Sequence, residues 1–448
     1  MLRMKFLPLM AAFTLASDFP ALALTSVETS LGLLPQPALH PRLLRSSDDL
    51  HVAWMFEPTN GSAWWVVVDG KTNGAYAEIG QALFSADGRR VAWVARRSHE
   101  WFVVLDGKAG PGYDAVGDLR FSADGRHFAY VAGRNGTWQA LVDGVPQKPF
   151  GRVGDIVFSP DGRRVAYGIA VPTNRYAVVC DGKPGPEFDG VATPVFSPDG
   201  QRMAYGVVEG GKQRMMLEGR PQPLFDGVGQ PAFSPDSQHL AYPARRGRKQ
   251  FVVMDGKTGS EYDLIDDPGP VFSANSKHVA YLAALGTNSA VVTDGIQGPL
   301  HENVGEGSLV VNADGSLWAY AAAQSNLWFV VSNGAAGHAY DGVGEGTPVI
   351  SPDGKRLAYA AHQKNKWRVI VDGQAGEPYD LVRAFSLRFS PDSRHLAFVA
   401  LENRHWFVVV DGQKGPDYDL PPARPDFTPA GVEYLAVRNG ELFRCRLQ

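Results

Sequence analysis

The chain is poor in cysteine and in long apolar runs. Its 448 residues include two cysteines, Cys180 and Cys445, which are too few to build a disulfide framework. Beyond an apolar stretch near the N-terminus, no segment approaches the roughly 20 apolar residues that a membrane helix needs. The sequence therefore predicts a chain held together by packing, without an integral membrane segment.

An excess of one charge is also missing. The 43 Lys and Arg residues nearly balance the 47 Asp and Glu residues, which leaves a formal charge of −4 at pH 7. Whole-chain charge therefore indicates neither a nucleic acid nor a membrane surface as partner, and we expect no nucleic-acid binding. With 44% hydrophobic residues and 50 glycines, the composition is typical of a turn-rich globular protein.

Catalytic and metal-binding motifs are incomplete wherever they begin. Gly70-Lys-Thr72 resembles the end of a phosphate-binding loop, but Trp65 stands where that loop requires its first glycine. His99-Glu100 lacks the second histidine of a zinc-protease helix, and neither a Gly-x-Ser-x-Gly elbow nor a structural zinc spacing occurs. We therefore predict no catalytic, cofactor-binding or metal-binding residue.

Residues 1–23 have the pattern of a secretory signal peptide. Arg3 and Lys5 give a basic start, residues 6–16 form an apolar run, and Ala21-Leu-Ala23 is a small-x-small cleavage site. We expect the mature chain to begin near Leu24 and to be periplasmic or secreted. Retention of the segment as an uncleaved membrane anchor is the alternative.

What the sequence does contain is a repeat of 37–39 residues. One copy runs through Phe158-Ser-Pro-Asp-Gly-Arg-Arg-Val-Ala-Tyr167 and continues over 176–190. A degenerate first copy lies at 44–54, and the other ten are marked by the turn serine or its substitute at Ser85, Ser122, Ser159, Ser197, Ser234, Ser273, Asn312, Ser351, Ser390 and Thr428. A fixed period of this length indicates a stack of supersecondary units.

Each copy predicts four short strands. Val165-Ala-Tyr-Gly-Ile-Ala170 alternates large and small residues, and the following Val-Val-Val segment is apolar on both faces, as in strands covered on both sides. Ser159-Pro-Asp-Gly162 and Asp181-Gly182 are hairpin signals, and a short outer strand is expected near Glu187-Phe188. Helix signals are absent from the repeats. The sequence therefore predicts an all-β propeller of about ten complete four-stranded blades plus a partial eleventh.

These motifs resemble the TolB-type, WD-like β-propeller repeat family. The resemblance rests on Phe-Ser-Pro-Asp-Gly, Val-Ala-Tyr and the aromatic-valine strand, and it covers about residues 41–448. It implies the propeller fold. For function it implies only that such blades occur in envelope scaffold proteins and as non-catalytic domains of some peptidases.

The number of rings is open at this stage. Propellers typically carry 4–8 blades, so eleven copies favour two rings, divided where Asp266-Asp-Pro-Gly-Pro270 lengthens the period into repeats at 41–265 and 266–448. A single wide ring is the alternative. Residues 24–40 lie outside the repeats, and Ser26–Leu34 is expected to supply the outer strand that the truncated last copy lacks. Because Cys180 and Cys445 lie in copies four and eleven, both should be unpaired.

The turn aspartates at Asp161, Asp199, Asp353 and Asp392 have two interpretations. Calcium would need six to eight oxygens at close range, whereas a turn aspartate beside proline and glycine is explained by the turn alone. We favour the structural interpretation.

The loops between the second and third strands vary between copies and are basic. Variable loops on a rigid scaffold commonly carry binding, and a cationic face attracts acidic partners. The predicted partner-binding residues are Arg96, Arg97, Arg245, Arg246, Arg248, Lys249, Lys364 and Lys366. A solvated surface without a partner would give the same pattern.

We therefore expect an exported, non-enzymatic platform for a protein or anionic glycan partner. The alternative is an envelope polysaccharide lyase or glycosidase with its site in the propeller channel. That alternative requires titratable groups that converge on one funnel.

Overall fold

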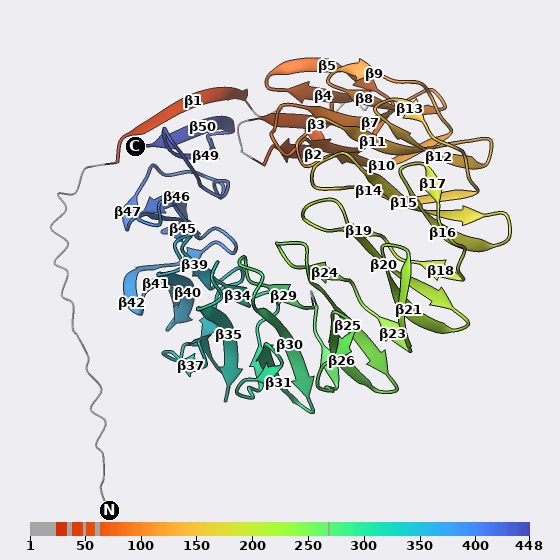
Figure 1. Cartoon of the computed structure of the whole chain (residues 1–448). Coiled ribbons are helices and arrows are strands. Elements are labelled where there is room, and N and C mark those ends of the chain that lie inside the picture. The colour runs from red at the N-terminus through yellow and green to blue at the C-terminus, as the bar shows by residue number, and fades with distance from the viewer. Residues whose placement is uncertain (1–23, 34–37, 48–50, 59–62, 268) are drawn as a thin grey trace, which may run out of the picture.

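A computed structural model describes residues 24–33, 38–47, 51–58, 63–267 and 269–448, so the predicted signal segment 1–23 lies outside the described residues. All the regular secondary structure within these residues consists of β-strands. The strands form eleven antiparallel sheets that stand side by side around a central hole (Figure 1). The all-β propeller predicted from the repeat is confirmed.

The first four blades have uninterrupted inner strands. Blades 1 to 4 consist, from the channel outward, of β2 (Ala38–Arg45), β3 (Val52–Pro58), β4 (Trp64–Val68), β5 (Lys71–Tyr76); β6 (Glu78–Phe84), β7 (Val91–Arg97), β8 (Glu100–Leu105), β9 (Lys108–Ala109); β10 (Ala115–Phe121), β11 (Phe128–Arg134), β12 (Thr137–Val142), β13 (Val145–Pro146); and β14 (Arg152–Phe158), β15 (Val165–Val171), β16 (Arg175–Cys180), β17 (Lys183–Pro184).

In blades 5 to 10 the inner strand is split into two short pieces. Blades 5 to 7 consist of β18 (Gly190–Val191), β19 (Val195–Phe196), β20 (Met203–Glu209), β21 (Lys212–Leu217), β22 (Arg220–Phe225); β23 (Gly227–Val228), β24 (Ala232–Phe233), β25 (Leu240–Arg246), β26 (Lys249–Met254), β27 (Lys257–Thr258); and β28 (Leu264–Ile265), β29 (Val271–Phe272), β30 (Val279–Leu285), β31 (Asn288–Thr293), β32 (Ile296–Gln297).

Blades 8 to 10 repeat this plan. They consist of β33 (Asn303–Val304), β34 (Val310–Val311), β35 (Trp318–Gln324), β36 (Leu327–Ser332), β37 (Ala335–Ala336); β38 (Gly342–Val343), β39 (Val349–Ile350), β40 (Leu357–Gln363), β41 (Lys366–Val371), β42 (Gln374–Tyr379); and β43 (Leu381–Val382), β44 (Arg388–Phe389), β45 (Leu396–Glu402), β46 (His405–Val410), β47 (Gln413–Lys414).

Blade 11 combines the two ends of the chain. From the channel outward it contains β48 (Asp426–Thr428), β49 (Gly431–Arg438), β50 (Glu441–Leu447) and β1 (Ser26–Leu33). β1 pairs antiparallel with β50, from Ser26 opposite Leu447 to Leu33 opposite Glu441. The N-terminal segment thus supplies the outer strand at the expected position, and the edge of β50 is covered.

The preference for two rings was wrong, because all eleven blades form one ring (Figure 1). The lengthening at 266–270 does not separate two bodies. It adds residues between β28 and β29, inside the inner strand of blade 7. The seam is closed by packing as well: one buried cluster contains Val52 of blade 1, Val399 of blade 10 and Leu435 of blade 11.

A buried polar network attaches β1 to blade 11. Glu28 accepts a hydrogen bond from the Tyr418 hydroxyl at 2.8 Å and is paired with the guanidinium of Arg438. Burial raises the pKa of Tyr418, which therefore remains a neutral donor, and it raises the pKa of the neighbouring Cys445 thiol to about 11. Cys445 and Cys180 are both unpaired, as predicted.

The Ser-Pro-Asp-Gly turn is held by its own side chains. In blade 4 the Ser159 hydroxyl donates to Asp161 Oδ1 at 2.5 Å, and the same oxygen accepts the Arg163 N–H at 3.1 Å. Gly162 has φ +71°, a left-handed conformation that favours glycine. These bonds explain the turn aspartate without a metal ion.

The Asp-Gly turn lies beside the first turn of the same blade. Asp181 accepts the Val165 N–H at 3.0 Å on Oδ1 and the Arg164 Nε–H at 3.1 Å on Oδ2. Both turn types therefore lie on one rim of the ring, called here the turn face. The loops between second and third strands lie on the opposite rim, called here the hairpin face. The short outer strand of blade 4 is Lys183–Pro184, with Phe188 forming a single bridge to Tyr176.

Candidate interaction face

The densest predicted cluster lies on the hairpin face of blade 6, where β25 turns into β26. Arg245 donates from Nη2 to the Asp226 carbonyl at 3.0 Å and from Nη1 to the Gly247 carbonyl at 3.1 Å. The guanidinium of Arg246 lies 5.3 Å from the ring of Phe251. The guanidinium groups of Arg245 and Arg246 are therefore partly engaged in hydrogen bonds and ring stacking within their own blade.

Arg248 and Lys249 complete the cluster. Lys249 pairs with Asp263 at 2.7 Å, across the boundary to blade 7. Arg248 is exposed at the tip of the turn, and its side chain makes no hydrogen bond or ion pair within the described part of the chain. The structure thus brings Arg245, Arg246, Arg248 and Lys249 together on one loop.

The other four predicted residues lie on the same face but in other blades. In blade 2, Arg96 pairs with Glu78 and stacks on Trp101 at 5.6 Å, and Arg97 lies 5.5 Å from the ring of Phe102. In blade 9, Lys366 pairs with Asp380 at 2.6 Å and Lys364 is exposed. The eight residues therefore form three separate groups around the ring rather than one patch.

Sequence reasoning missed the acidic partners of these lysines. A lysine at the start of the third strand pairs with the aspartate that opens the next blade, as in Lys212–Asp226, Lys249–Asp263 and Lys366–Asp380. Each aspartate also accepts a backbone N–H from the hairpin of its own blade. The pKa of Asp226 is lowered first by its bond to Lys212 and then by the Gly247 N–H. The signal in the sequence is an aspartate fourteen residues after each lysine.

The channel wall carries acids and one aromatic that were also missed. In blades 7 to 10 five residues separate the two pieces of the inner strand, and these connections carry Asp266, Asp267, Glu306, Glu345 and Phe385. The pKa of Asp266 is raised, first by burial and then by Glu306 and Asp267. The signal in the sequence is the change of period to 39 residues, which marks these longer channel connections and not a ring boundary.

Phe385 has an unusual backbone conformation. It lies at φ +58°, whereas Gly307 and Gly346 occupy the same position in blades 8 and 9 at +65° and +74°. Its side chain is 63% exposed and contacts Gly346 of the preceding blade. A bulky residue in this conformation is strained.

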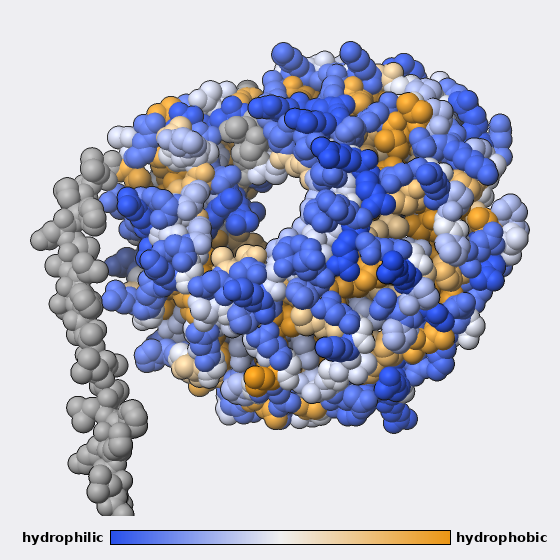
Figure 2. Space-filling model, viewed as in Figure 1, coloured by the Kyte–Doolittle hydropathy of each residue, from blue (hydrophilic) through white to orange (hydrophobic). Residues whose placement is uncertain are grey.

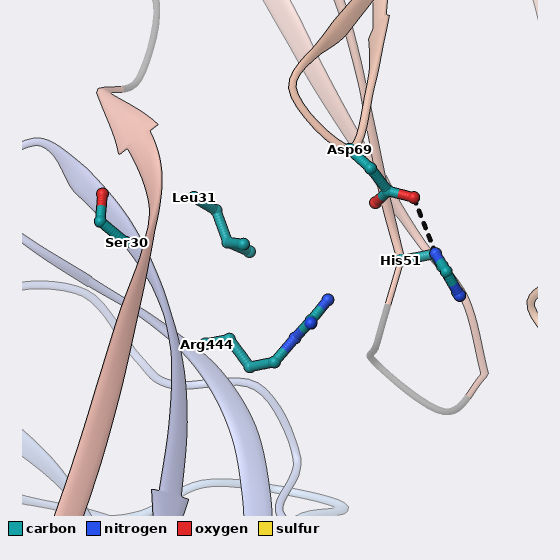
Figure 3. Close-up of a pocket in the computed structure, with 5 residues that line it drawn as sticks. All are labelled: Ser30, Leu31, His51, Asp69 and Arg444. Atoms are coloured by element: carbon teal, nitrogen blue, oxygen red, sulfur yellow. Dashed lines mark hydrogen bonds and ion pairs between the residues drawn. The ribbon is translucent and has the colours of Figure 1, made fainter.

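Two depressions flank blade 11. A small one of about 400 Å³ lies at the seam with blade 1, where Ser30, Leu31 and Arg444 of blade 11 lie opposite the His51–Asp69 pair (Figure 3). A groove of about 1450 Å³ lies between blades 10 and 11 on the turn face. Figure 2 shows a mainly hydrophilic surface around the open hole.

The described residues contain no group of three or more His, Cys, Asp or Glu side chains arranged to hold a metal ion. They also contain no helix long and apolar enough to cross a membrane.

Neither a protein-family model nor a curated protein sequence matches the chain. Solved structures match at low identity. A eukaryotic initiation factor shares 13% identity, with 74% of this chain and 97% of that chain covered and a TM-score of 0.41. TolB from Acinetobacter baumannii shares 16% identity over 58% of this chain and 77% of that chain, with a TM-score of 0.27. The β-propeller domain of the Trilobed protease from Pyrococcus furiosus shares 16% identity over 59% and 96%, with a TM-score of 0.28.

These matches are to other β-propellers, including TolB, and they assign neither a family nor a function. The propeller fold of this chain stands on its own strand topology.

Proposed function

We propose that this eleven-bladed ring is an exported, non-enzymatic binding platform, and that the hairpin face of blade 6 binds an acidic protein surface or an anionic glycan. The observation that carries the proposal is the loop 245–249, which places four cations on one turn. Two aspartates lie nearby. Asp263 pairs with Lys249 of the loop, whereas Asp226 is already paired with Lys212, which lies outside the loop. The loop therefore retains net positive charge.

The chemistry of the loop favours carboxylate or sulfate groups. A guanidinium presents a planar fork that donates two parallel hydrogen bonds to such groups. Exposed pairs contribute only about 0–1 kcal/mol each, so affinity requires several loops of one face to act together. The groups at Arg96-Arg97 and Lys364–Lys366 add charge on the same face, chiefly from Arg97 and Lys364, because Arg96 is paired with Glu78 and Lys366 with Asp380.

Charge reversal at Arg246 and Arg248 tests the proposal. Dextran sulfate and polygalacturonate serve as sulfated and carboxylated probes. We expect the double variant R246E/R248E to elute from both immobilised glycans at lower salt than the wild type, because it has lost two of the cations that hold the glycan. Salt is a sensitive readout, since screening weakens exposed charge pairs at about 0.15 M. The matched control is R163E/R126E on the turn face. Equal elution of the wild type and the R246E/R248E variant would contradict the assignment of this face.

The export part of the proposal has its own test. Processing at the predicted site gives a mature N-terminus near Leu24 and protein in the periplasmic or secreted fraction. Recovery of an intact Met1 terminus from soluble cytoplasm would contradict it.

A channel enzyme is the second candidate, because Asp266 and Glu306 are electrostatically coupled at the channel wall and the pKa of Asp266 is raised. A pair of carboxyl groups in which burial raises the pKa of one member is the kind of arrangement that glycoside hydrolysis uses. Release of reducing ends from envelope polysaccharide by the wild type, abolished in D266N, would favour this candidate over the platform.

A further inference from the structure

Four blade interfaces on the turn face are bridged by an arginine. In blade 2, Arg90 donates from Nε to Asp106 at 3.0 Å and from Nη1 to the Arg126 carbonyl of blade 3 at 2.9 Å. Its guanidinium lies 5.3 Å from the ring of Phe121 in blade 3. The same stacking recurs in the pairs Arg164–Phe196, Arg202–Phe233 and Arg356–Phe389. The chain therefore repeatedly fills this interblade space with a guanidinium over a phenyl ring.

The interface between blades 10 and 11 has the ring but no bridging arginine. The aromatic is Phe427, and the residue of blade 10 at the arginine position is His395, whose Nδ1 lies 2.5 Å from Asp411. Other interfaces also carry histidine here. His127, for example, stacks on Phe158 of the next blade at 6.4 Å. No such stacking of His395 on Phe427 occurs within the described residues.

The hairpin of blade 11 is also short. Four residues lie between the paired Phe427 and Val432, whereas blade 3 has six residues between the corresponding pair, Phe121 and Phe128. In the neighbouring interface, Ser393 of blade 10 accepts the Asp353 N–H of blade 9 at 2.9 Å. Blade 11 has no serine at this place. The missing residues leave the groove of about 1450 Å³.

The groove combines an apolar floor with carboxylates. Phe427, Val410, Val432 and Leu447 line it, together with Asp392 and Asp411. The Asp392 carboxyl is held ionised, because the Ser390 hydroxyl bonded to it lowers its pKa. Two cations also lie at the groove. Arg356 is engaged with Asp372 and the Arg394 carbonyl, and Arg394 is exposed.

We propose that this groove binds an arginine side chain from an extended segment of a partner protein, with its guanidinium over Phe427 and its charge paired with Asp392, since Asp411 is already bonded to His395. The occupant is argued from the four interfaces of the same ring, where a guanidinium takes the equivalent position. Arginine fits better than lysine because its planar head stacks on an aromatic ring and reaches a carboxylate at the same time. The apolar floor accommodates the flanking residues of the segment.

This surface is distinct from the hairpin face and would take the opposite charge. The exposed Arg394 disfavours a segment with several adjacent cations, because like charges repel. The partner is therefore expected to present a single arginine between apolar residues.

The test uses the full chain and the peptide acetyl-Ala-Leu-Arg-Leu-Ala-amide, with lysine and citrulline analogues, in isothermal titration at matched ionic strength. We expect the arginine peptide to bind about tenfold more tightly than the citrulline peptide, since the latter lacks the charge. Equal binding of both, or no saturable binding of the arginine peptide, would overturn the proposal.

A substitution that fills the groove gives the second arm. His395→Arg places the chain's own guanidinium over Phe427, so it should raise the melting temperature and weaken peptide binding about tenfold. The matched control is His127→Arg, at an interface with a full-length hairpin, which should leave peptide affinity unchanged. Phe427→Leu keeps the apolar volume and should weaken the preference for arginine over lysine. Peptide binding by His395→Arg at wild-type affinity would place the site elsewhere.

Discussion

The inner strands of blades 2 to 4 and of blades 7 to 10 cross the channel wall in different ways. β6, β10 and β14 are single seven-residue strands with one register shift each. In blades 7 to 10 two-residue strands stand on either side of a five-residue connection. The second strands are seven residues long in both arcs, for example β11 and β35. Differences in repeat length are thus located in the inner strand, which borders the open hole. The second and third strands do not vary in this way, because they are covered on both faces.

The two arcs are also tied differently. Gln81 accepts the Leu119 N–H of blade 3 at 3.1 Å, and Asp118 accepts the Ile156 N–H of blade 4 at 2.5 Å. This series of sideways bonds ends at blade 5, because the corresponding residue is Pro194, which has no N–H. In blade 8 the Ser308 hydroxyl instead binds within its own blade, to the Gly305 carbonyl at 2.6 Å. Between blades 9 and 10 the sideways bond is made by the backbone, where the Phe385 N–H donates to the Glu345 carbonyl at 3.2 Å.

The largest expected difference is between blade 3 of the first arc and blade 8 of the second, at the leucine three positions before the turn residue Ser122 or Asn312. Leu119 is fully buried in β10, whereas Leu309 at the same place in blade 8 is only half-buried. Leu119→Ala should cost about 2–5 kcal/mol, because it leaves a cavity. Leu309→Ala should cost clearly less. Denaturant unfolding followed by tryptophan fluorescence measures both, and equal losses would mean that blades 3 and 8 are packed alike at this position.

Two glycines separate backbone strain from interblade packing. Gly162 and Gly307 have φ +71° and +65°, so valine is strained at either place by about 1–3 kcal/mol. A side chain at Gly162 would also meet Asp124 and His127 of the preceding blade at 3.2 Å, whereas nothing lies within 4 Å of the position at Gly307. Gly162→Val should therefore lower the melting temperature more than Gly307→Val. The reverse order would show that the turn face is less tightly packed than its bonds indicate.

The structure of a single blade was predictable from the sequence, whereas the number of rings was not. The turn at Ser159–Gly162 and the closing strand at Ser26 follow from turn chemistry and from the missing fourth strand, which are properties of one blade. The ring count depends on whether the residues inserted at 266–270 enter a linker or a channel loop. Nothing in the local pattern distinguishes these two cases.

The candidate site was predicted in part for the same reason. The cations at 245–249 are adjacent in the chain and were found together. The pairing of Lys249 with Asp263 crosses a blade boundary, so it depends on a register that only the assembled ring provides. The groove beside blade 11 was missed because it arises from two residues that are absent from a hairpin.

The sideways bond of Asp118 can be tested against its unbonded counterpart. Asp118→Ala removes the acceptor for the Ile156 N–H and should cost about 0.5–1.5 kcal/mol. Asp155 stands at the same position in blade 4, and the corresponding residue of blade 5 is Pro194, which has no N–H to donate, so Asp155→Ala should leave the free energy of unfolding nearly unchanged. Similar losses in the two variants would show that the bond does not tie the blades together.

The smallest expected effect is shared by both arcs and concerns the acid stability of the turn face. The pKa of Asp161 is lowered first by the Ser159 hydroxyl and then by the Arg163 N–H. The folded state therefore binds the proton less readily than the unfolded chain. The stability that this carboxylate contributes is complete above the unfolded pKa of about 4 and is lost as the pH falls through the lower folded value.

Blade 7 provides the natural control for this titration. Asn275 stands at the same position, accepts the Ser273 hydroxyl at 2.7 Å and the Lys277 N–H at 3.0 Å, and has no charge to lose. Asp161→Asn should therefore keep the unfolding midpoint near its wild-type value at pH 7 and lose less of it between about pH 5 and pH 3. Denaturant midpoints measured across that range decide the matter. If the variant and the wild type lose stability in parallel, Asp161 does not contribute to acid sensitivity, and the loss must come from other carboxylates such as Asp226 and Asp263, whose pKa values are also lowered.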